Sequence, residues 1–242
     1  MRPLGTETSS VRAHQWRHTR PSDGRWNLIV DVQGVSGVEN MAADEALLDD
    51  AARSRRASLR LYRWDPPTLS VGRNQSLDGL AHGIPIVRRP TGGQAVWHDH
   101  ELTYAVAAPI ATFGSLRKAY REIHARLATA LRSLGVDAVL AVAPAVRPSG
   151  RPAACFAASV GGEILVHGRK LVGSAQVRRG DAFLQHGSIL IDGAQPSSGN
   201  GETTLAAVLG RSVSFGEVAD AIIKTWSEAA ARSPDVASIA AE

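Results

Sequence analysis

The chain has 242 residues, of which 44% are hydrophobic and 21% are charged, and its formal net charge is +4 at pH 7. This length and apolar content suffice for one large domain with a buried core, and no apolar run reaches the length of a membrane span. The single cysteine excludes an internal disulfide. The mild positive charge lacks a dense basic cluster interleaved with aromatic residues, which argues against nucleic-acid binding and favours an acidic protein partner.

The first 24 residues contain arginines together with Glu7 and Asp23, but no apolar core of the kind found in a signal peptide. We therefore expect a disordered N-terminal tail at residues 1–24, a single domain at residues 25–232 and a C-terminal tail at residues 233–242. The absence of a secretion signal and of a disulfide framework predicts a cytoplasmic protein.

Hydrophobic periodicity predicts the helices and strands of this domain. Residues 38–52 carry apolar side chains at helical spacing, and a longer apolar stripe over residues 116–134 begins after Ser115, a good N-cap. Ser214 and Glu217 form a capping box before the last helix. A short helix is expected at residues 203–209, and strands at residues 26–32, 59–62, 68–71, 84–87, 102–108, 136–142, 163–167, 170–177 and 183–191. Strands and helices interleave without strict βαβ alternation, which predicts an α+β fold of mixed β-sheets packed against helices.

Residues 88–104 are the most informative stretch of the chain. The strand expected at residues 84–87 stops at Pro90, and Gly92 and Gly93 then allow the backbone to turn tightly and to approach a ligand. Successive amides in such a turn can converge on a carboxylate, a phosphate or a developing oxyanion. From the glycines alone, a tight hairpin without a ligand is the alternative.

The whole motif is more specific than its glycines. Residues 88–99 read Arg-Arg-Pro-Thr-Gly-Gly-Gln-Ala-Val-Trp-His-Asp. They resemble the Arg-Arg-x-Ser/Thr-Gly-Gly-x-Ala-Val-x-His-Asp signature of the superfamily of lipoate–protein ligase A, the octanoyltransferases and the biotin ligases. Residues 168–176 and 184–190 resemble its Lys-x-x-Gly-Ser-Ala and His-Gly-Ser/Thr-Ile/Leu-Leu blocks, in the same order. The resemblance covers roughly residues 26–230 and implies a biotin/lipoate protein ligase catalytic-domain fold.

The resemblance also implies a set of site residues. The implied catalytic residues are Cys155 and Lys170, and the implied substrate-binding residues are Arg73, Arg89, Thr91, Gly92, Gly93, Gln94, Ala95, His98, Gly173, Ser174, Ala175, His186 and Gly187. For Arg89, His98 and His186, a role in hydrogen-bonded architecture is the alternative to lining a pocket. The histidines show no metal-ligand spacing, so we expect no metal site.

Cys155 follows residues 144–154, a stretch with three prolines that we predict to be a mobile loop. A single cysteine is by itself more often a small buried apolar residue. The text around it, eight residues before Glu163 and fifteen before Lys170, resembles the nucleophile loop of octanoyltransferases that act on the glycine-cleavage H protein. A thiolate suits acyl transfer between a thioester and a lysine, and a nearby cation favours the thiolate.

Lys170 is the candidate for that cation, and the resemblance implies that it also binds the acyl carbonyl and stabilises the oxyanion. A solvent-exposed lysine at a strand end is the alternative for Lys170.

Four features favour a cysteine-dependent octanoyltransferase over an ATP-dependent lipoate ligase. Cys155 is present, and Gln94 stands where ligases usually carry a third glycine. Residues 98–104 look like the transferase form of the motif, where ligases tend to have Gly-Asn. The chain ends at Glu242, which leaves no room for the accessory domain that many ligases append. Residues 157–162 depart from the transferase pattern, because two glycines replace bulkier residues there.

The predicted activity is transfer of an octanoyl group from octanoyl-acyl carrier protein to a lysine of a lipoyl-domain protein, such as glycine-cleavage H protein or a 2-oxoacid dehydrogenase E2. We expect a monomer that needs no cofactor and binds neither membrane nor nucleic acid, with an acyl slot near Val87, Val96 and Val172. Two alternatives stay open. One is a lipoate–protein ligase that uses ATP and Mg, and the other is a degenerate relative that binds a lipoyl domain without turnover.

Overall fold

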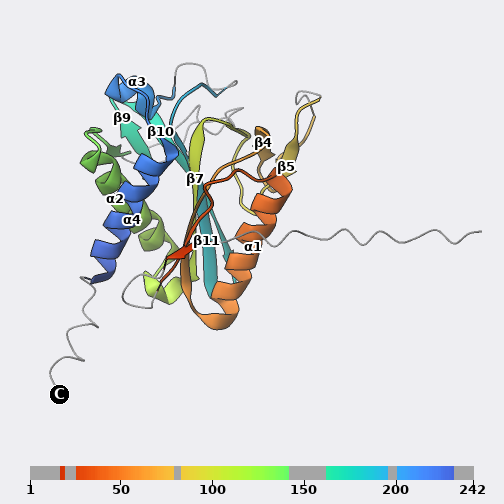
Figure 1. Ribbon diagram of the computed structural model, residues 1–242. Coiled ribbons are helices and arrows are strands. Elements are labelled where there is room, and N and C mark those ends of the chain that lie inside the picture. The colour runs from red at the N-terminus through yellow and green to blue at the C-terminus, as the bar shows by residue number, and fades with distance from the viewer. Residues whose placement is uncertain (1–16, 20–25, 79–82, 142–161, 196–200, 232–242) are drawn as a thin grey trace, which may run out of the picture.

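The structure, a computed structural model, describes residues 17–19, 26–78, 83–141, 162–195 and 201–231. In these residues a mixed eight-stranded sheet runs through the centre of the molecule (Figure 1). From one edge to the other its strands are β1 (Arg17–Thr19), β2 (Trp26–Val30), β3 (Ala57–Tyr62), β7 (Glu101–Pro109), β11 (Ala182–Leu190), β10 (Arg169–Arg179), β9 (Ile164–Val166) and β8 (Val139–Leu140). β2 and β3 are parallel, and the other neighbouring pairs are antiparallel.

A second, three-stranded sheet lies near the beginning of the first helix (Figure 1). Its strands, in spatial order, are β5 (Ile86–Arg88), β4 (Thr68–Val71) and β6 (Val96–His98). β4 pairs parallel with β5 and antiparallel with β6, so the Gly-Gly turn between β5 and β6 connects the two edges of this sheet. The small sheet therefore carries the turn and holds it beside the large sheet.

Helices cover both faces of the large sheet (Figure 1). The helices are α1 (Gly37–Ser54), η1 (Ile110–Thr112), α2 (Leu116–Ser133), α3 (Leu205–Leu209) and α4 (Phe215–Ala231). α2 and α4 lie side by side on one face, and α1 crosses the other. None of the helices in the described parts of the chain is long and apolar enough to cross a membrane.

The central strand β7 shows why both faces are covered. Leu102, Tyr104 and Val106 belong to the core cluster on the side of α2 and α4, whereas Ala105 and Ala107 pack in the cluster that contains α1. All nine residues of β7 are buried, as expected for a strand with helices on both sides. The alanines leave room for α1 to lie close to the sheet.

A buried arginine connects α1 to the sheet. Arg60 of β3 donates hydrogen bonds to Asp44 Oδ1 (3.0 Å), Asn40 Oδ1 (2.7 Å) and Asp31 Oδ2 (2.8 Å), and its side chain is 1% exposed. Burial alone would lower the pKa of Arg60, but the negative charges of Asp44 and Asp31 offset burial, and the pKa is raised. Arg60 is therefore a buried cation, and two carboxylates balance its charge.

The α+β class with mixed sheets and packed helices is confirmed. Three elements differ from the expectations. β6 was not predicted, because only three residues form it and their partner is the distant strand β4. Of the strand expected at residues 136–142, residues 136–141 are described, and among these only Val139–Leu140 forms a strand.

Arg17–Thr19, inside the segment expected to be a tail, pairs with β2, which corrects that expectation for these three residues. A short strand at the edge of a sheet is held by backbone hydrogen bonds. It therefore needs no alternating apolar pattern from which the sequence could predict it. The domain boundaries stay predictions, because most of both tails lies outside the described residues.

Replacing Arg60 by methionine should destabilise the protein by about 3–5 kcal/mol, because Asp44 would keep a buried charge without its cation. The matched control is Arg179→Met, which removes an ion pair to Asp49 whose two side chains are 46% and 43% exposed, and it should cost about 1 kcal/mol or less. Denaturant unfolding measures both free energies, and equal losses would contradict the role of Arg60.

Candidate active site

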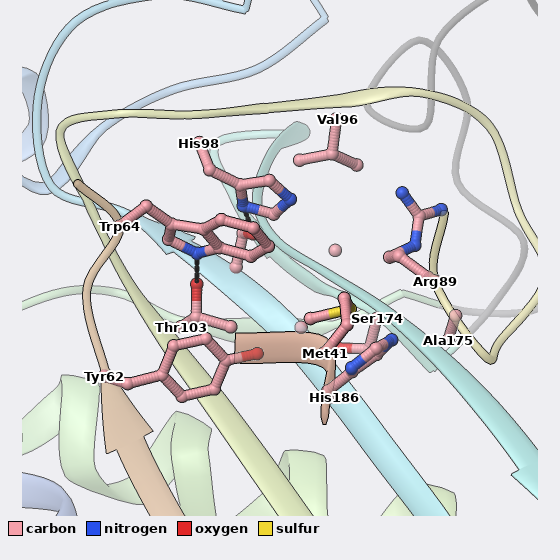
Figure 2. A pocket seen from close by; sticks show the side chains of 13 residues that line it. Met41, Tyr62, Trp64, Arg89, Val96, His98, Thr103, Ser174, Ala175 and His186 are labelled. Carbon is pink, nitrogen blue, oxygen red and sulfur yellow. Dashed lines mark hydrogen bonds between the residues drawn. The ribbon is translucent and has the colours of Figure 1, made fainter. Parts of the chain in front are cut away.

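A pocket lies between the beginning of α1, the small sheet and strands β7, β10 and β11 (Figure 2). It is lined by Met41, Tyr62, Trp64, Arg89, Val96, His98, Thr103, Gly173, Ser174, Ala175, His186, Gly187 and Ser188. Ser174, Ala175 and Gly187 are only half-buried, whereas Tyr62 and Thr103 are fully buried. Among the described residues, the pocket therefore opens over β10 and β11 and closes against β3 and β7.

His98 forms one wall of the pocket and is held by two hydrogen bonds. The Glu101 carboxylate can only accept, so His98 Nδ1 carries the proton of the neutral ring and donates it to Glu101 Oε1 at 2.6 Å. His98 Nε2 therefore accepts from the Ser70 hydroxyl at 2.5 Å, and Ser70 Oγ also accepts from Arg89 Nη1 (2.7 Å). Burial lowers the pKa of His98, although Glu101 opposes this effect, and the neutral ring stacks on Trp64 with centroids 3.9 Å apart.

Glu101 binds the polar ends of several lining residues. Its Oε1 atom accepts hydrogen bonds from Ser188 Oγ (3.0 Å) and from the hydroxyl of Thr103, in addition to His98. Thr103 Oγ1 in turn accepts the indole proton of Trp64 at 2.7 Å (Figure 2). The donors of these residues are therefore used inside the protein and are not offered to the pocket.

Asp44 has the same role from α1. Its Oδ2 atom accepts hydrogen bonds from His186 Nδ1 (2.8 Å) and from the Tyr62 hydroxyl (2.9 Å), while Oδ1 binds Arg60. Burial, followed by the charge of Asp44, raises the pKa of Tyr62 well above its usual value, so Tyr62 remains a hydroxyl donor. His186 Nε2 lies 2.7 Å from Thr91 Oγ1. Asp44 thus links helix α1, strand β11 and the start of the Gly-Gly turn.

The Gly-Gly turn is held from inside by Arg89. Its Nη2 atom donates to the carbonyl oxygens of Gly92 (3.2 Å) and Gln94 (2.8 Å), and its Nη1 atom donates to the carbonyl of Ser70 (2.8 Å). Gly93 has a φ of 97°, which favours glycine at this position. The amides of Gly92, Gly93 and Gln94 donate to no other group in the described part of the chain.

Lys170 lies in a second polar cluster, on the α2 side of β10. Lys170 Nζ is 2.6 Å from Glu163 Oε1, and both side chains are 2% exposed. The alternative of a solvent-exposed lysine at a strand end is therefore wrong, because the ion pair with Glu163 compensates the buried charge. Lys170 does not line the pocket.

His124 of α2 belongs to the same region. Its Nε2 atom lies 2.8 Å from Ser174 Oγ, which is also 2.7 Å from the Tyr104 hydroxyl. Burial lowers the pKa of His124 to about 3, and the positive charge of Lys170 acts in the same direction. At neutral pH His124 is an uncharged group that fixes the position of the Ser174 hydroxyl.

The structure brings together about half of the predicted site residues in one pocket. The predicted residues that line it are Arg89, His98, Gly173, Ser174, Ala175, His186 and Gly187. Gly187 has no room for a side chain, since a Cβ there would lie 2.3 Å from Ser174 Oγ and 2.4 Å from the Gly173 carbonyl oxygen.

The other predicted residues lie elsewhere. Thr91, Gly92, Gly93, Gln94 and Ala95 form the turn beside the pocket and do not line it. Arg73 is exposed, and its amide donates to the Thr91 carbonyl at 2.8 Å.

Cys155 and the predicted loop at residues 144–154 lie outside the described residues. Of the three valines expected near an acyl slot, Val96 lines the pocket, and Val87 and Val172 do not.

The sequence interpretation missed the residues that arrange the polar lining. Asp44 lies on the buried stripe of α1, three residues after Met41 and four before Leu48, and a charge on an apolar stripe was the available signal. Glu101 stood inside the motif without an assigned role. Within the described residues, no group of three His, Cys, Asp or Glu side chains is arranged to hold a metal ion.

Comparison with known proteins identifies the family. Residues 36–227 match the family described as the lipoyl protein ligase A/B catalytic domain, and the chain belongs to that family. It is 42% identical over 177 residues to the octanoyltransferase LipM of Carboxydothermus hydrogenoformans, and the aligned region covers 69% of this chain and 65% of that protein. It is 37% identical over 236 residues to the LipM of Symbiobacterium thermophilum, which covers 84% of this chain and 86% of that protein.

The chain spans a little under two thirds of the first of these relatives, at 65% of its length. Among solved structures, protein Ta0514 of T. acidophilum with bound lipoic acid superposes with a TM-score of 0.63 at 25% identity, over 85% of each chain.

The buried histidine of α2 predicts a specific pH dependence of stability. The pKa of His124 falls from 6.5 to about 3 on folding, so the unfolded chain takes up the proton first as the pH decreases. The contribution of neutral His124 to the free energy of unfolding is fully present above pH 6.5. It is lost as the pH falls from there towards 3, by about 1.4 kcal/mol per pH unit.

His124→Gln should remove this contribution, and denaturant titrations of the two proteins at several pH values would measure the difference. Parallel pH profiles for the wild type and His124→Gln would contradict the assignment of a buried neutral His124.

Proposed function

We propose that this chain transfers an octanoyl group from octanoyl-acyl carrier protein to a lysine of a lipoyl-domain protein, through an acyl thioester on Cys155. The observation that carries the proposal is the pocket of Figure 2, which is adjacent to a turn whose amides donate to no group among the described residues. The similarity to proteins named octanoyltransferase LipM supports the same reaction.

The pocket suits a saturated chain although many of its lining residues are polar. The donors of Trp64, Thr103 and Ser188 are used by hydrogen bonds that lead to Glu101, and those of Tyr62 and His186 bind Asp44. These residues therefore offer rings, methyl groups and methylenes to the cavity. Burying six or seven methylenes there contributes on the order of 5 kcal/mol, which is enough to hold an octanoyl chain.

The Gly-Gly turn suits the carbonyl end of the chain. Arg89 holds the carbonyls of Gly92 and Gln94, and the amides of Gly92, Gly93 and Gln94 can donate to an oxyanion. Fixed amide donors of this kind stabilise the tetrahedral intermediates of acyl transfer. The turn would therefore act where the thioester carbonyl becomes negatively charged.

The first step joins the acyl group to the enzyme. The Cys155 thiolate attacks the thioester carbonyl, a carbon–sulfur bond to Cys155 forms, and the bond to the carrier sulfur breaks, so that the carrier leaves as a thiol after taking up one proton. A nearby cation favours the thiolate. Lys170 is our candidate, and its buried pair with Glu163 keeps the ammonium in one place.

The second step transfers the acyl group to the acceptor. The acceptor amine attacks the acyl-Cys155 carbonyl, the amide bond forms, and the Cys155 sulfur leaves. The proton lost by the amine returns to the sulfur or to solvent. Lys170 would donate a hydrogen bond to the carbonyl in both steps. The chemistry needs neither ATP nor a metal, and we propose that the reaction proceeds without a cofactor, in the cytoplasm.

The alternative is ATP-dependent lipoate ligation. Ligases and transferases share this fold, so the fold does not discriminate between them. A requirement for ATP and a dependence on Cys155 distinguish the two reactions, because a ligase activates its acid as an adenylate and needs no acyl-cysteine.

The test is intact-mass measurement of the purified protein after mixing with octanoyl-acyl carrier protein in the absence of ATP. We expect a gain of one octanoyl unit, which is lost when an apo lipoyl domain is added and appears on that acceptor. Cys155→Ala should show no adduct, and thermal unfolding of the variant verifies that it is folded.

Acceptor modification that occurs only with free lipoate and ATP, and persists in Cys155→Ala, would overturn the proposal in favour of a ligase. Tight binding of the acceptor without modification under either condition would indicate a binding protein.

A further inference from the structure

The pocket has few lining side chains whose size can change without breaking a hydrogen bond. The polar lining residues are tied to Asp44, Glu101 or the Gly-Gly turn, and the Ser174 hydroxyl is tied to Tyr104 and His124. Gly173 and Gly187 contribute backbone. The remaining lining residues are Met41, Val96 and Ala175.

Of these three residues, Met41 is the longest and reaches the closed end. Val96 packs against Leu190, and Ala175 lies at the half-buried opening over β10. Met41 is 5% exposed and packs in one cluster with Tyr62 and Trp64, which close the pocket. Figure 2 shows its thioether inside the ring of lining residues, between Trp64 and His186 in this view.

A methionine side chain is well suited to the closed end of a pocket, where it would contact the methyl end of an acyl chain. Its side chain is unbranched, flexible and polarizable, and it fills space without needing a hydrogen-bond partner. An acyl chain that enters with its carbonyl near the Gly-Gly turn would bring its methyl end to the closed end, where Met41 lies. We propose that Met41 sets the length of the acyl chain that the pocket accepts, an inference that rests on the proposed acyl transfer.

The test compares transfer of hexanoyl, octanoyl and decanoyl groups from acyl carrier protein to an apo lipoyl domain, by kcat/KM. In Met41→Ala, the ratio of decanoyl to octanoyl transfer should rise on the order of tenfold, because two more methylenes can be buried. In Met41→Phe, the pocket becomes shorter, so the ratio of hexanoyl to octanoyl transfer should rise and decanoyl transfer should fall.

Val38→Ala is the matched control, because Val38 lies in the same first turns of α1 and is 69% exposed. This variant should keep the wild-type ratios. Thermal unfolding establishes that each variant is folded, and the two Met41 variants act in opposite directions, so one of them suffices if the other does not fold.

Wild-type transfer of octanoyl groups together with unchanged ratios in the folded Met41 variants would overturn the role of Met41 and leave the proposed function intact. A wild-type protein that transfers none of the three chains would overturn the proposed function, and the role of Met41 with it.

Discussion

The site depends most on the hydrogen bonds and the ion pair that the buried carboxylate of Asp44 forms. Its two oxygens bind Arg60, Tyr62 and His186, and so join helix α1 to strands β3 and β11. Taking a carboxylate out of water costs several kcal/mol unless a cation and further donors compensate the charge. Here Arg60 supplies the cation, and the remaining lone pairs are used by side chains that face the pocket. The position of α1, and with it Met41, follows from this contact.

Glu101 is the second buried carboxylate that binds residues of the pocket lining. Together the two carboxylates bind the polar ends of Tyr62, Thr103 and Ser188, which lie on three strands of one sheet. Although many lining residues are polar, their donors are already hydrogen-bonded within the protein. The surface that the cavity presents is therefore largely apolar. Near the cavity, Arg89 holds the Gly-Gly turn, whose amides at Gly92, Gly93 and Gln94 donate to no group among the described residues. In the proposed reaction the acyl chain would occupy the cavity, and the thioester carbonyl would lie at the turn.

The sequence alone was informative where the signal is local. The stripe of α2, its Ser115 cap and the turn at Gly92 could be predicted because each depends on neighbouring residues. The contact of His186 with Asp44 joins residues 142 positions apart, so it depends on how α1 packs on β11 and has no local signature. The motif located His98 and His186 at the pocket, but not the direction of their hydrogen bonds. The place of Cys155 relative to the pocket stays a prediction.

The most direct test of this account is a crystal structure of the protein after reaction with octanoyl-acyl carrier protein. We expect an octanoyl chain that extends from Cys155 past the amides of the Gly-Gly turn and ends against Met41, between Trp64 and the strands β10 and β11. Density for the chain at another site, with the pocket empty or with water bound to Thr103 and Ser188, would contradict the claim that the two buried carboxylates make this cavity an acyl site.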